Sequence, residues 1–284
     1  MKKIFPLLAA FLLVSCGAAP QGSSHATGSS PSEASTPAAS SATIPTYPEA
    51  QDAEKVASGQ YIRGKYVYNL DKANKKLTCV DYGMDYNKLK NKEGTTVFEV
   101  AISFVVYGDH GNAIAYKVEK EQRYLYVDAS DKLTEDALAL SEGQISFSST
   151  NLSPVPEFVM PTYGSYVSSK EFTQDKVDGE GKRIPTSEGG YEKESFYLFL
   201  DLTATSAKIY VGENATSHKE TPLHQVENYA LTYNVRGLSI KIPHVGGEFN
   251  CTLTITAANE IRFNNSYEKH GDYSAAGTFV PVEA

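Results

Sequence analysis

The sequence predicts an all-β protein, an antiparallel meander that forms a barrel or a sandwich and contains little helix. Segments in which apolar and polar residues alternate recur at a spacing of roughly ten residues, with turn residues between them. The chain also has 19 Tyr and no Trp, and tyrosine is favoured on half-buried pleated surfaces. Many short strands at this spacing are typical of barrels and sandwiches.

The clearest strand is predicted over residues 95–107, because its apolar residues recur with a period of two. One face is wholly apolar and carries Phe98, Val100, Ile102, Phe104 and Val106. Turn residues at 109–112 then separate it from a second alternating segment at 114–118, which predicts a hairpin. Further hairpins are predicted at 61–70 with 76–82, 195–202 with 207–211, 229–235 with 238–242, and 249–256 with 260–263, followed by a last strand at 277–282.

One segment has the spacing of a helix. Within residues 130–140, Leu133, Ala137 and Leu140 lie three and four positions apart, which predicts a short helix. An irregular link between strands is the alternative.

A long loop insertion is predicted at 152–194. Proline cannot donate to a strand ladder, and Pro154, Pro156 and Pro161 lie in its first part. The rest, 171–194, is charged and rich in glycine. We expect residues 49–284 to form one β domain carrying this insertion, with two β subdomains divided near residue 153 as the alternative.

The N-terminus has the pattern of an export signal. Lys2 and Lys3 precede an apolar run of eleven residues, Ile4–Val14, whereas a membrane-spanning helix needs about 20. A removable signal at 1–15 is therefore predicted. The residues Leu13-Val14-Ser15-Cys16 resemble the lipobox of bacterial lipoproteins. That resemblance implies cleavage before Cys16 and diacylation of its thiol, so that the lipid anchors the chain to a membrane.

The residues after Cys16 predict a disordered tether over 16–48. Of the 32 residues from Gly17 to Pro48, 27 are Gly, Ala, Ser, Thr or Pro. Such a segment buries too little apolar surface to offset the conformational entropy lost on ordering. The resemblance implies an N-terminus that carries two or three acyl chains, and two or more chains anchor a protein stably to a membrane. We therefore expect a lipid-anchored protein of the cell envelope. By resemblance to enterobacterial lipoproteins, Gly17 after the lipidated cysteine favours the outer membrane.

Net charge and cysteine content restrict the expected binding partners and the expected state of the thiols. The formal net charge is −8, and an acidic surface is repelled by phosphate backbones, so no nucleic-acid partner is expected. Lipidation of Cys16 leaves Cys79 and Cys251. In an oxidising compartment these two either form a disulfide or remain as buried free thiols.

Motifs for catalysis or metal binding are missing from the sequence. It contains no Gly-x-Ser-x-Gly, His-Glu-x-x-His or Cys-x-x-Cys. Ser165 is expected in a loop, and His218 and His224 are expected to be solvated. Asp175, Asp178 and Glu180 form a weak calcium candidate around a glycine, with an exposed turn as the alternative. We therefore predict no catalytic residue and no cofactor.

The C-terminal part, from Tyr229 onward, resembles the lipocalin-like domains of bacterial surface proteins. The resemblance lies in the segments 238–242, 251–255, 260–263 and 271–273, the last of which is Gly-Asp-Tyr. It implies a meander barrel, although the Trp of the lipocalin motif is absent.

Together these observations predict an envelope lipoprotein that is not an enzyme. Its β body would be a binding or structural module for an unknown protein or small molecule. The alternatives are a small-ligand carrier with a barrel cavity and, with less support, a secreted hydrolase with dispersed acidic residues.

Overall fold

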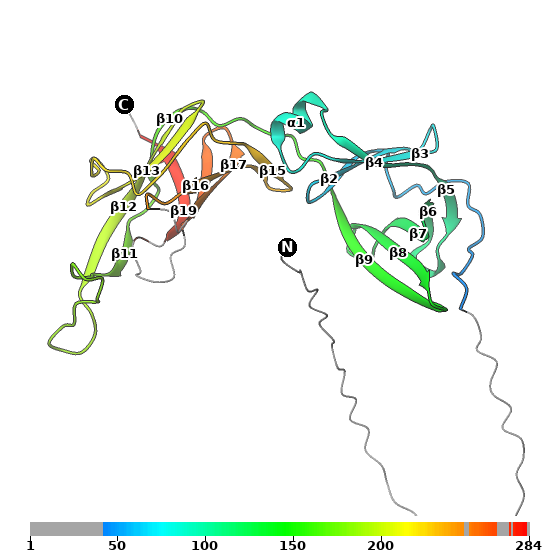
Figure 1. Ribbon diagram of the computed structural model, residues 1–284, viewed down its shortest axis with the longest axis horizontal. Coiled ribbons are helices and arrows are strands. Elements are labelled where there is room, and N and C mark those ends of the chain that lie inside the picture. Colours follow the sequence, from blue (N-terminus) through cyan, green and yellow to red (C-terminus); the bar gives the residue numbers. More distant parts are fainter. Residues whose placement is uncertain (1–41, 247–249, 266–272, 274, 283–284) are drawn as a thin grey trace, which may run out of the picture. The chain divides into compact units, whose positions relative to one another are not determined.

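The computed structural model describes residues 42–246, 250–265, 273 and 275–282. It confirms the all-β fold. One antiparallel sheet of nine strands forms a nearly closed barrel, and a second of ten strands forms a half-barrel (Figure 1). Helix in the described residues is limited to α1 (Tyr86–Asn91) and the 3-10 turn Gly108–His110. Neither has the length and apolar character that a membrane-crossing helix requires.

The first sheet has the order β4-β3-β2-β1-β9-β8-β7-β6-β5. Its strands are β1 (Gly59–Arg63), β2 (Tyr66–Asp71), β3 (Lys76–Asp81), β4 (Thr95–Ala101), β5 (Ser103–Val106), β6 (Asn112–Val118), β7 (Glu121–Val127), β8 (Leu133–Ser141) and β9 (Gln144–Pro154). The single predicted strand at 61–70 is in fact two strands, β1 and β2, which are separated by a turn at Gly64 and Lys65.

Closure of the first barrel depends on the segment predicted as one strand at 95–107. Its first half, β4, pairs with β3, and its second half, β5, pairs with β6. The segment is interrupted at Ile102, so the two ends of the sheet order are consecutive in the chain. As predicted, one face points inward: Phe98, Val100, Ile102 and Phe104 all belong to the barrel core. Val106 departs from the pattern and is exposed.

The predicted helix at 130–140 is wrong, and so is its alternative, an irregular link. Residues 133–141 form β8, which pairs with β7 on one side and β9 on the other. Two ladders of hydrogen bonds and the burial of side chains on both faces of the strand outweigh the weak helical spacing. The helix that does occur, α1, was not predicted. The Asp85 side chain caps it by accepting a hydrogen bond from the Asn87 N–H at 2.8 Å.

The second sheet has the order β14-β13-β12-β10-β19-β18-β17-β16-β15, and β11 pairs with β12. Its strands are β10 (Gly164–Ser168), β11 (Phe172–Asp175), β12 (Lys193–Leu202), β13 (Ser206–Gly212), β14 (His224–Glu227), β15 (Thr232–Asn234), β16 (Gly237–Pro243), β17 (Asn250–Ala257), β18 (Glu260–Asn265) and β19 (Ala275–Pro281). The strands that carry the lipocalin-like resemblance are β16, β17 and β18. Gly271 and Asp272 of that pattern lie outside the described residues.

The insertion predicted at 152–194 contains more than loop. β10 lies within the second sheet, between β12 and β19. β11 pairs with β12, and the chain between these two strands forms the long loop that ends in the projecting segment of Figure 1. The change from one sheet to the other falls between Pro154 and Gly164. Whether the body is one domain or two subdomains stays a prediction.

Candidate functional site

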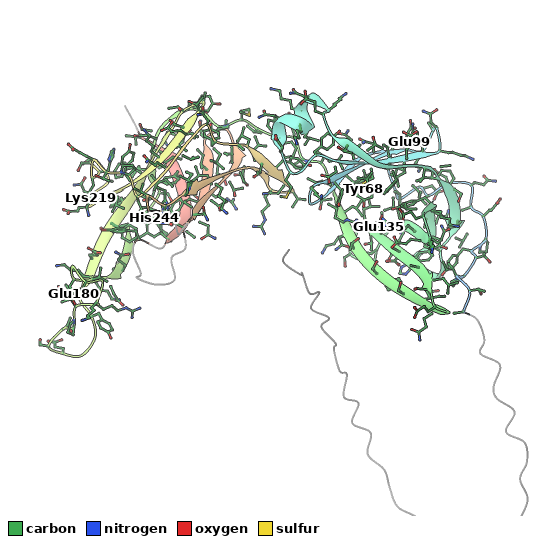
Figure 2. The ribbon with its side chains drawn as sticks, in the orientation of Figure 1. Tyr68, Glu99, Glu135, Glu180, Lys219 and His244 are labelled. Carbon is green, nitrogen blue, oxygen red and sulfur yellow. The ribbon has the colours of Figure 1, made fainter. Side chains whose placement is uncertain are left out.

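Two consecutive acidic residues of β8, Glu135 and Asp136, are buried, each with 2% of its surface exposed. Successive side chains of a strand point to opposite faces of the sheet. Glu135 therefore points into the first barrel, where Figure 2 also labels Tyr68, and Asp136 points to its outer face. A buried carboxylate must be compensated by hydrogen bonds or opposite charge, so the partners of these two residues define two candidate sites.

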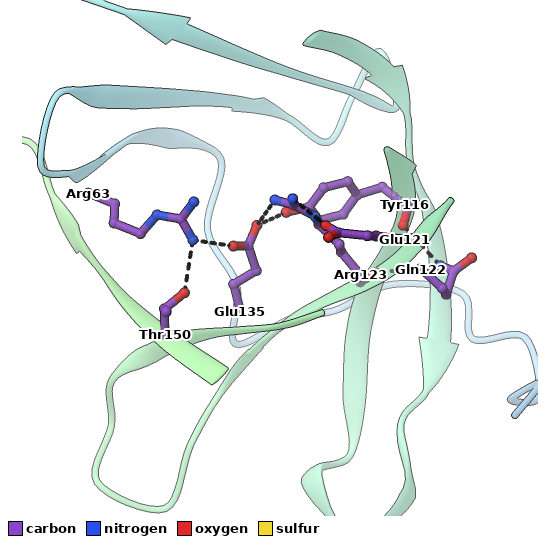
Figure 3. Close-up of polar contacts among 7 residues, drawn as sticks. All are labelled: Arg63, Tyr116, Glu121, Gln122, Arg123, Glu135 and Thr150. Carbon is purple, nitrogen blue, oxygen red and sulfur yellow. Dashed lines mark hydrogen bonds and ion pairs between the residues drawn. The ribbon is translucent and has the colours of Figure 1, made fainter. Parts of the chain in front are cut away.

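Inside the barrel, three donors converge on the Glu135 carboxylate (Figure 3). Arg63 Nη1 lies 2.6 Å from Oε2, and Arg123 Nη1 lies 3.3 Å from Oε1. The Tyr116 hydroxyl also donates to Oε1. Burial raises the pKa of Tyr116 well above its ordinary value, and the nearby carboxylate raises it further. The hydroxyl therefore keeps its proton and remains a donor.

The two arginines have further acceptors. Arg63 Nη1 also donates to Thr150 Oγ1 at 2.9 Å. Arg123 Nε and Nη2 donate to Glu121 Oε2 at 2.9 and 2.5 Å. We call the residues in these contacts, which come from β1, β6, β7, β8 and β9, the Glu135 network: Arg63, Tyr116, Glu121, Arg123, Glu135 and Thr150.

The Glu135 network spans the shortest ladder between neighbouring strands of the first sheet. β1 pairs with β9 only through Tyr61 with Pro154 and Ile62 with Ser153. Beyond those pairs, the Arg63 side chain bridges to Thr150 on β9 and to Glu135 on β8. Because this carboxylate already accepts from three donors, its geometry suits a structural connection better than proton transfer.

On the outer face, Asp136 lies beneath a cluster of tyrosines. The Tyr107 hydroxyl donates to Asp136 Oδ2 at 2.9 Å. The Tyr107 ring stacks on Tyr124 with centroids 4.3 Å apart, and Tyr47 meets Tyr107 edge-on at 4.9 Å. Burial raises the pKa of Tyr107, and Asp136 raises it further. The hydroxyl is therefore protonated at neutral pH and satisfies one oxygen of the carboxylate.

A groove of about 370 Å³ lies beside these rings. We call it the tyrosine groove. Residues 44–47 form one side, β5 to β7 form the other, and Tyr47 and Tyr124 contribute aromatic surface. Lys117, Lys120 and Gln122 add polar groups to its lining. The groove combines aromatic rings, which are enriched in protein interfaces, with polar side chains of the kind found at the rim of such interfaces.

The end of the predicted tether is part of this site. Val106 N–H donates to the Pro48 carbonyl at 2.8 Å, and Ala50 N–H donates to the Phe104 carbonyl at 2.9 Å. Ile44 and Tyr47 pack against the outer face of the barrel. Residues 44–48, which the sequence predicts as disordered, are thus ordered here. Small residues on β6, Ala113 and Ala115, are buried beneath this segment.

The cysteines follow the second of the two alternatives that the sequence left open. Cys79 and Cys251 are both free and buried. Cys79 belongs to the core of the first barrel, and Cys251 belongs to a separate cluster in the second sheet, so the disulfide is not formed. Burial raises the pKa of Cys79 to about 11 and that of Cys251 to about 12. Both thiols are therefore protonated and unreactive at neutral pH. Cys16 lies outside the described residues.

The calcium candidate does not form a site. Asp175 pairs with Lys193 and, at 3.2 Å, with Arg183. Asp178 Oδ1 accepts from backbone N–H groups. Glu180, on the projecting loop (Figure 2), pairs with Lys182 at 3.1 Å. The three carboxylates have separate partners, and the part of the chain that the structure describes contains no group of three residues that could hold a metal.

Two further predictions about polar residues are wrong. His224 is buried, and its Nε2 lies 2.9 Å from Asn265 Oδ1, whereas His218 is exposed as predicted. Ser165 lies on β10 rather than in a loop, and its hydroxyl donates to Asp201 Oδ1 at 2.7 Å.

Sequence reasoning missed both buried acids of β8. The available signal was their position, Glu135-Asp136 between the apolar Leu133 and Leu138.

Comparison with models of protein families, with curated proteins and with solved structures gave no match.

The Glu135 network predicts a large effect of one neutral substitution. Glu135→Gln removes the negative charge and leaves two arginines in the barrel without their shared partner. We expect the free energy of unfolding to fall by about 1–3 kcal/mol, less than for a fully buried pair, because Arg123 keeps Glu121 and the Arg63 side chain is 33% exposed. Urea denaturation measures it. Glu99→Gln is the matched control, because Glu99 pairs with Lys76 at 2.8 Å but its side chain is 53% exposed; it should change little. Equal effects of the two substitutions would contradict the structural role.

His224 predicts a loss of stability in mild acid. Burial, together with the nearby His244, lowers its pKa from 6.5 to about 4. Between these values the unfolded chain binds a proton that the folded chain does not, so stability falls as the pH drops from 6.5 to 4. We expect His224→Gln to remove up to about 3 kcal/mol of that dependence, measured by urea denaturation across the pH range. The exposed His218→Gln should keep the wild-type profile. A His224→Gln profile parallel to the wild type would count against the assignment.

Proposed function

We propose that the chain is a lipid-anchored protein of the cell envelope whose β body is a non-catalytic module that binds a partner protein. The observation that carries the binding role is the tyrosine groove. Tyr47 and Tyr124 line it, and both rings pack against Tyr107, whose hydroxyl donates to the buried Asp136. Tyrosine is enriched at the energetic centre of protein interfaces because it presents a large, rigid surface with a polar tip.

The anchor is supported by the N-terminal sequence. A basic start, an apolar run too short to span a bilayer, and Leu13-Val14-Ser15-Cys16 occur in the order that lipoproteins use. Gly17 favours the outer membrane as the destination. Ile44 packs on the barrel surface, and the residues between Cys16 and this point are mostly Gly, Ala, Ser, Thr and Pro.

Partner binding at the surface is favoured over carriage of a ligand inside the first barrel. Its interior is occupied by large side chains that include Tyr68, Leu77, Tyr116 and Leu125, and the Glu135 network crosses one part of it. A carrier would instead need an apolar cavity of several hundred Å³.

A hydrolase is less favoured for a geometric reason. Glycosidases need two carboxylates that face one another across the scissile bond. The buried pair on β8, Glu135 and Asp136, points to opposite faces of the sheet, so the two cannot act on one substrate. We accordingly propose no cofactor and no nucleic-acid partner.

Lipid anchoring predicts a specific chemical change at Cys16. In a bacterial host, the mature chain should begin at Cys16 and carry two or three acyl chains, detected by mass spectrometry and by labelling with a fatty-acid analogue. Cys16→Ser should abolish both the label and the recovery of the protein in the membrane fraction. The buried Cys79→Ser is the control and should leave the label unchanged. An unacylated N-terminus in the wild-type protein would refute this part of the proposal.

Binding at the tyrosine groove predicts sensitivity to its cationic residues. Lys117 and Lys120 are exposed, so reversing both charges, Lys117→Glu with Lys120→Glu, should leave the unfolding transition unchanged but reduce recovery of the bound protein. Affinity capture from envelope extract, quantified by mass spectrometry, measures that recovery. Lys241→Glu on β16 is the control, because Lys241 is also exposed and is absent from the lining of the groove. Equal recovery with both variants would reject the groove as the binding surface.

A further inference from the structure

The strand β9 has a long open edge. It pairs with β8 from Gln144 to Leu152, but with β1 only at Ser153 and Pro154. Among the described residues, no strand therefore pairs with the other side of Gln144–Leu152. In Figure 1 most of the β9 arrow runs with only β8 beside it. An edge of this kind presents unpaired backbone N–H and C=O groups to any further strand.

The edge has none of the features that usually protect such strands. Residues 144–152 contain no charged residue and no proline, and the β8–β9 register is regular, without a bulge. Proteins normally protect an exposed edge with charged residues, proline, bulges or short length. The edge strands of the second sheet are short by comparison, since β14 has four residues and β15 has three.

Apolar side chains lie next to this edge on the outer face. Phe147 is 62% exposed, and it lies opposite Leu138 on β8. Ile145 and Leu140 are also exposed, and they form the next pair on the same face. The edge thus combines free backbone groups with an apolar stripe, made of Leu138, Leu140, Ile145 and Phe147, that a neighbouring strand would cover.

We propose that β9 pairs antiparallel with β9 of a second copy of this chain, around a two-fold axis at Phe147. In this register Phe147 lies opposite Phe147 of the other copy, and Ile145 lies opposite Ser149. The two hairpins then form a continuous four-stranded sheet. Odd-numbered residues face odd-numbered residues, so the apolar stripes of both copies join on one face, and the aromatic pair adds to cross-strand stability.

A second copy fits this edge better than an unrelated strand for two reasons. A two-fold interface requires that one surface complement itself, and a strand without charge brings no like charges together when it pairs with its own copy. In addition, the second copy carries the same apolar stripe, which lies next to that of the first copy when the two β9 strands pair. The inference depends neither on lipid anchoring nor on the tyrosine groove, which lies between residues 44–47 and β5–β7.

Position-specific cross-linking of the full-length chain in detergent tests the register. Phe147→Cys should give a covalent dimer with a short bifunctional thiol reagent, because directly opposed residues bring their Cβ atoms within about 5 Å of each other. Ile145→Cys should not cross-link to itself, but it should form a heterodimer when mixed with Ser149→Cys. The control is Val97→Cys, since Val97 is exposed on β4. Cross-linking of Phe147→Cys no greater than that of the control would overturn the proposal.

Sedimentation of the full-length chain tests the pairing without added cysteines. The wild-type chain should sediment as a dimer, and Phe147→Lys should sediment as a monomer because two lysines then face each other at the axis. Mixing Phe147→Lys with Phe147→Glu should restore the dimer. The unfolding transition of each variant shows whether it has folded. A wild-type chain that stays monomeric at all concentrations, or that binds a foreign strand instead, would overturn the proposal.

Discussion

The strand arrangement of the first barrel depends on the buried carboxylate of Glu135. Glu135 is buried on β8 and accepts hydrogen bonds from Arg63, Arg123 and Tyr116. Arg63 is the donor that lies across the β1–β9 seam, where the backbone ladder is short. A buried ion pair adds little net stability over apolar residues of the same shape, but it specifies which groups must meet. Here it fixes Arg63 across the seam where β1 and β9 share only two residue pairs. The same strand places Asp136 under Tyr107, so β8 orders both the interior and the outer surface.

Most strands could be predicted because they depend on local alternation. Phe98, Val100, Ile102 and Phe104 show the inward face of one strand directly, and turn residues mark the hairpins. β8 could not be recognised in this way. Its sequence Leu-Thr-Glu-Asp-Ala-Leu-Ala-Leu places two acids in the middle, which suggests a surface helix. The residue that compensates Glu135 is Arg63, 72 positions earlier in the chain. No local pattern contains that information.

The same limit applies to the rest of the candidate site. Prolines around residue 156 predict a loop, yet β10 soon after them joins two strands that are distant in sequence, β12 and β19. The tether composition predicts disorder up to Pro48, but Tyr47 finds a ring partner in Tyr107, 60 positions later in the chain. His224 lies near a proline-containing loop, and its burial depends on Asn265. In each case a contact between residues distant in sequence decides whether the segment is ordered or buried. Local composition describes only what the segment favours in the absence of that contact.

The attachment of residues 44–50 to the barrel has a mechanical consequence. If the chain is lipid-anchored as we propose, a force transmitted along the tether reaches the hydrogen bonds of Pro48 and Ala50 with β5 before it reaches the closed sheet. These few bonds, together with the Tyr47 packing, would give way first and add slack to the linkage. The closed sheet would bear the load only after this segment, which forms one side of the tyrosine groove, had detached.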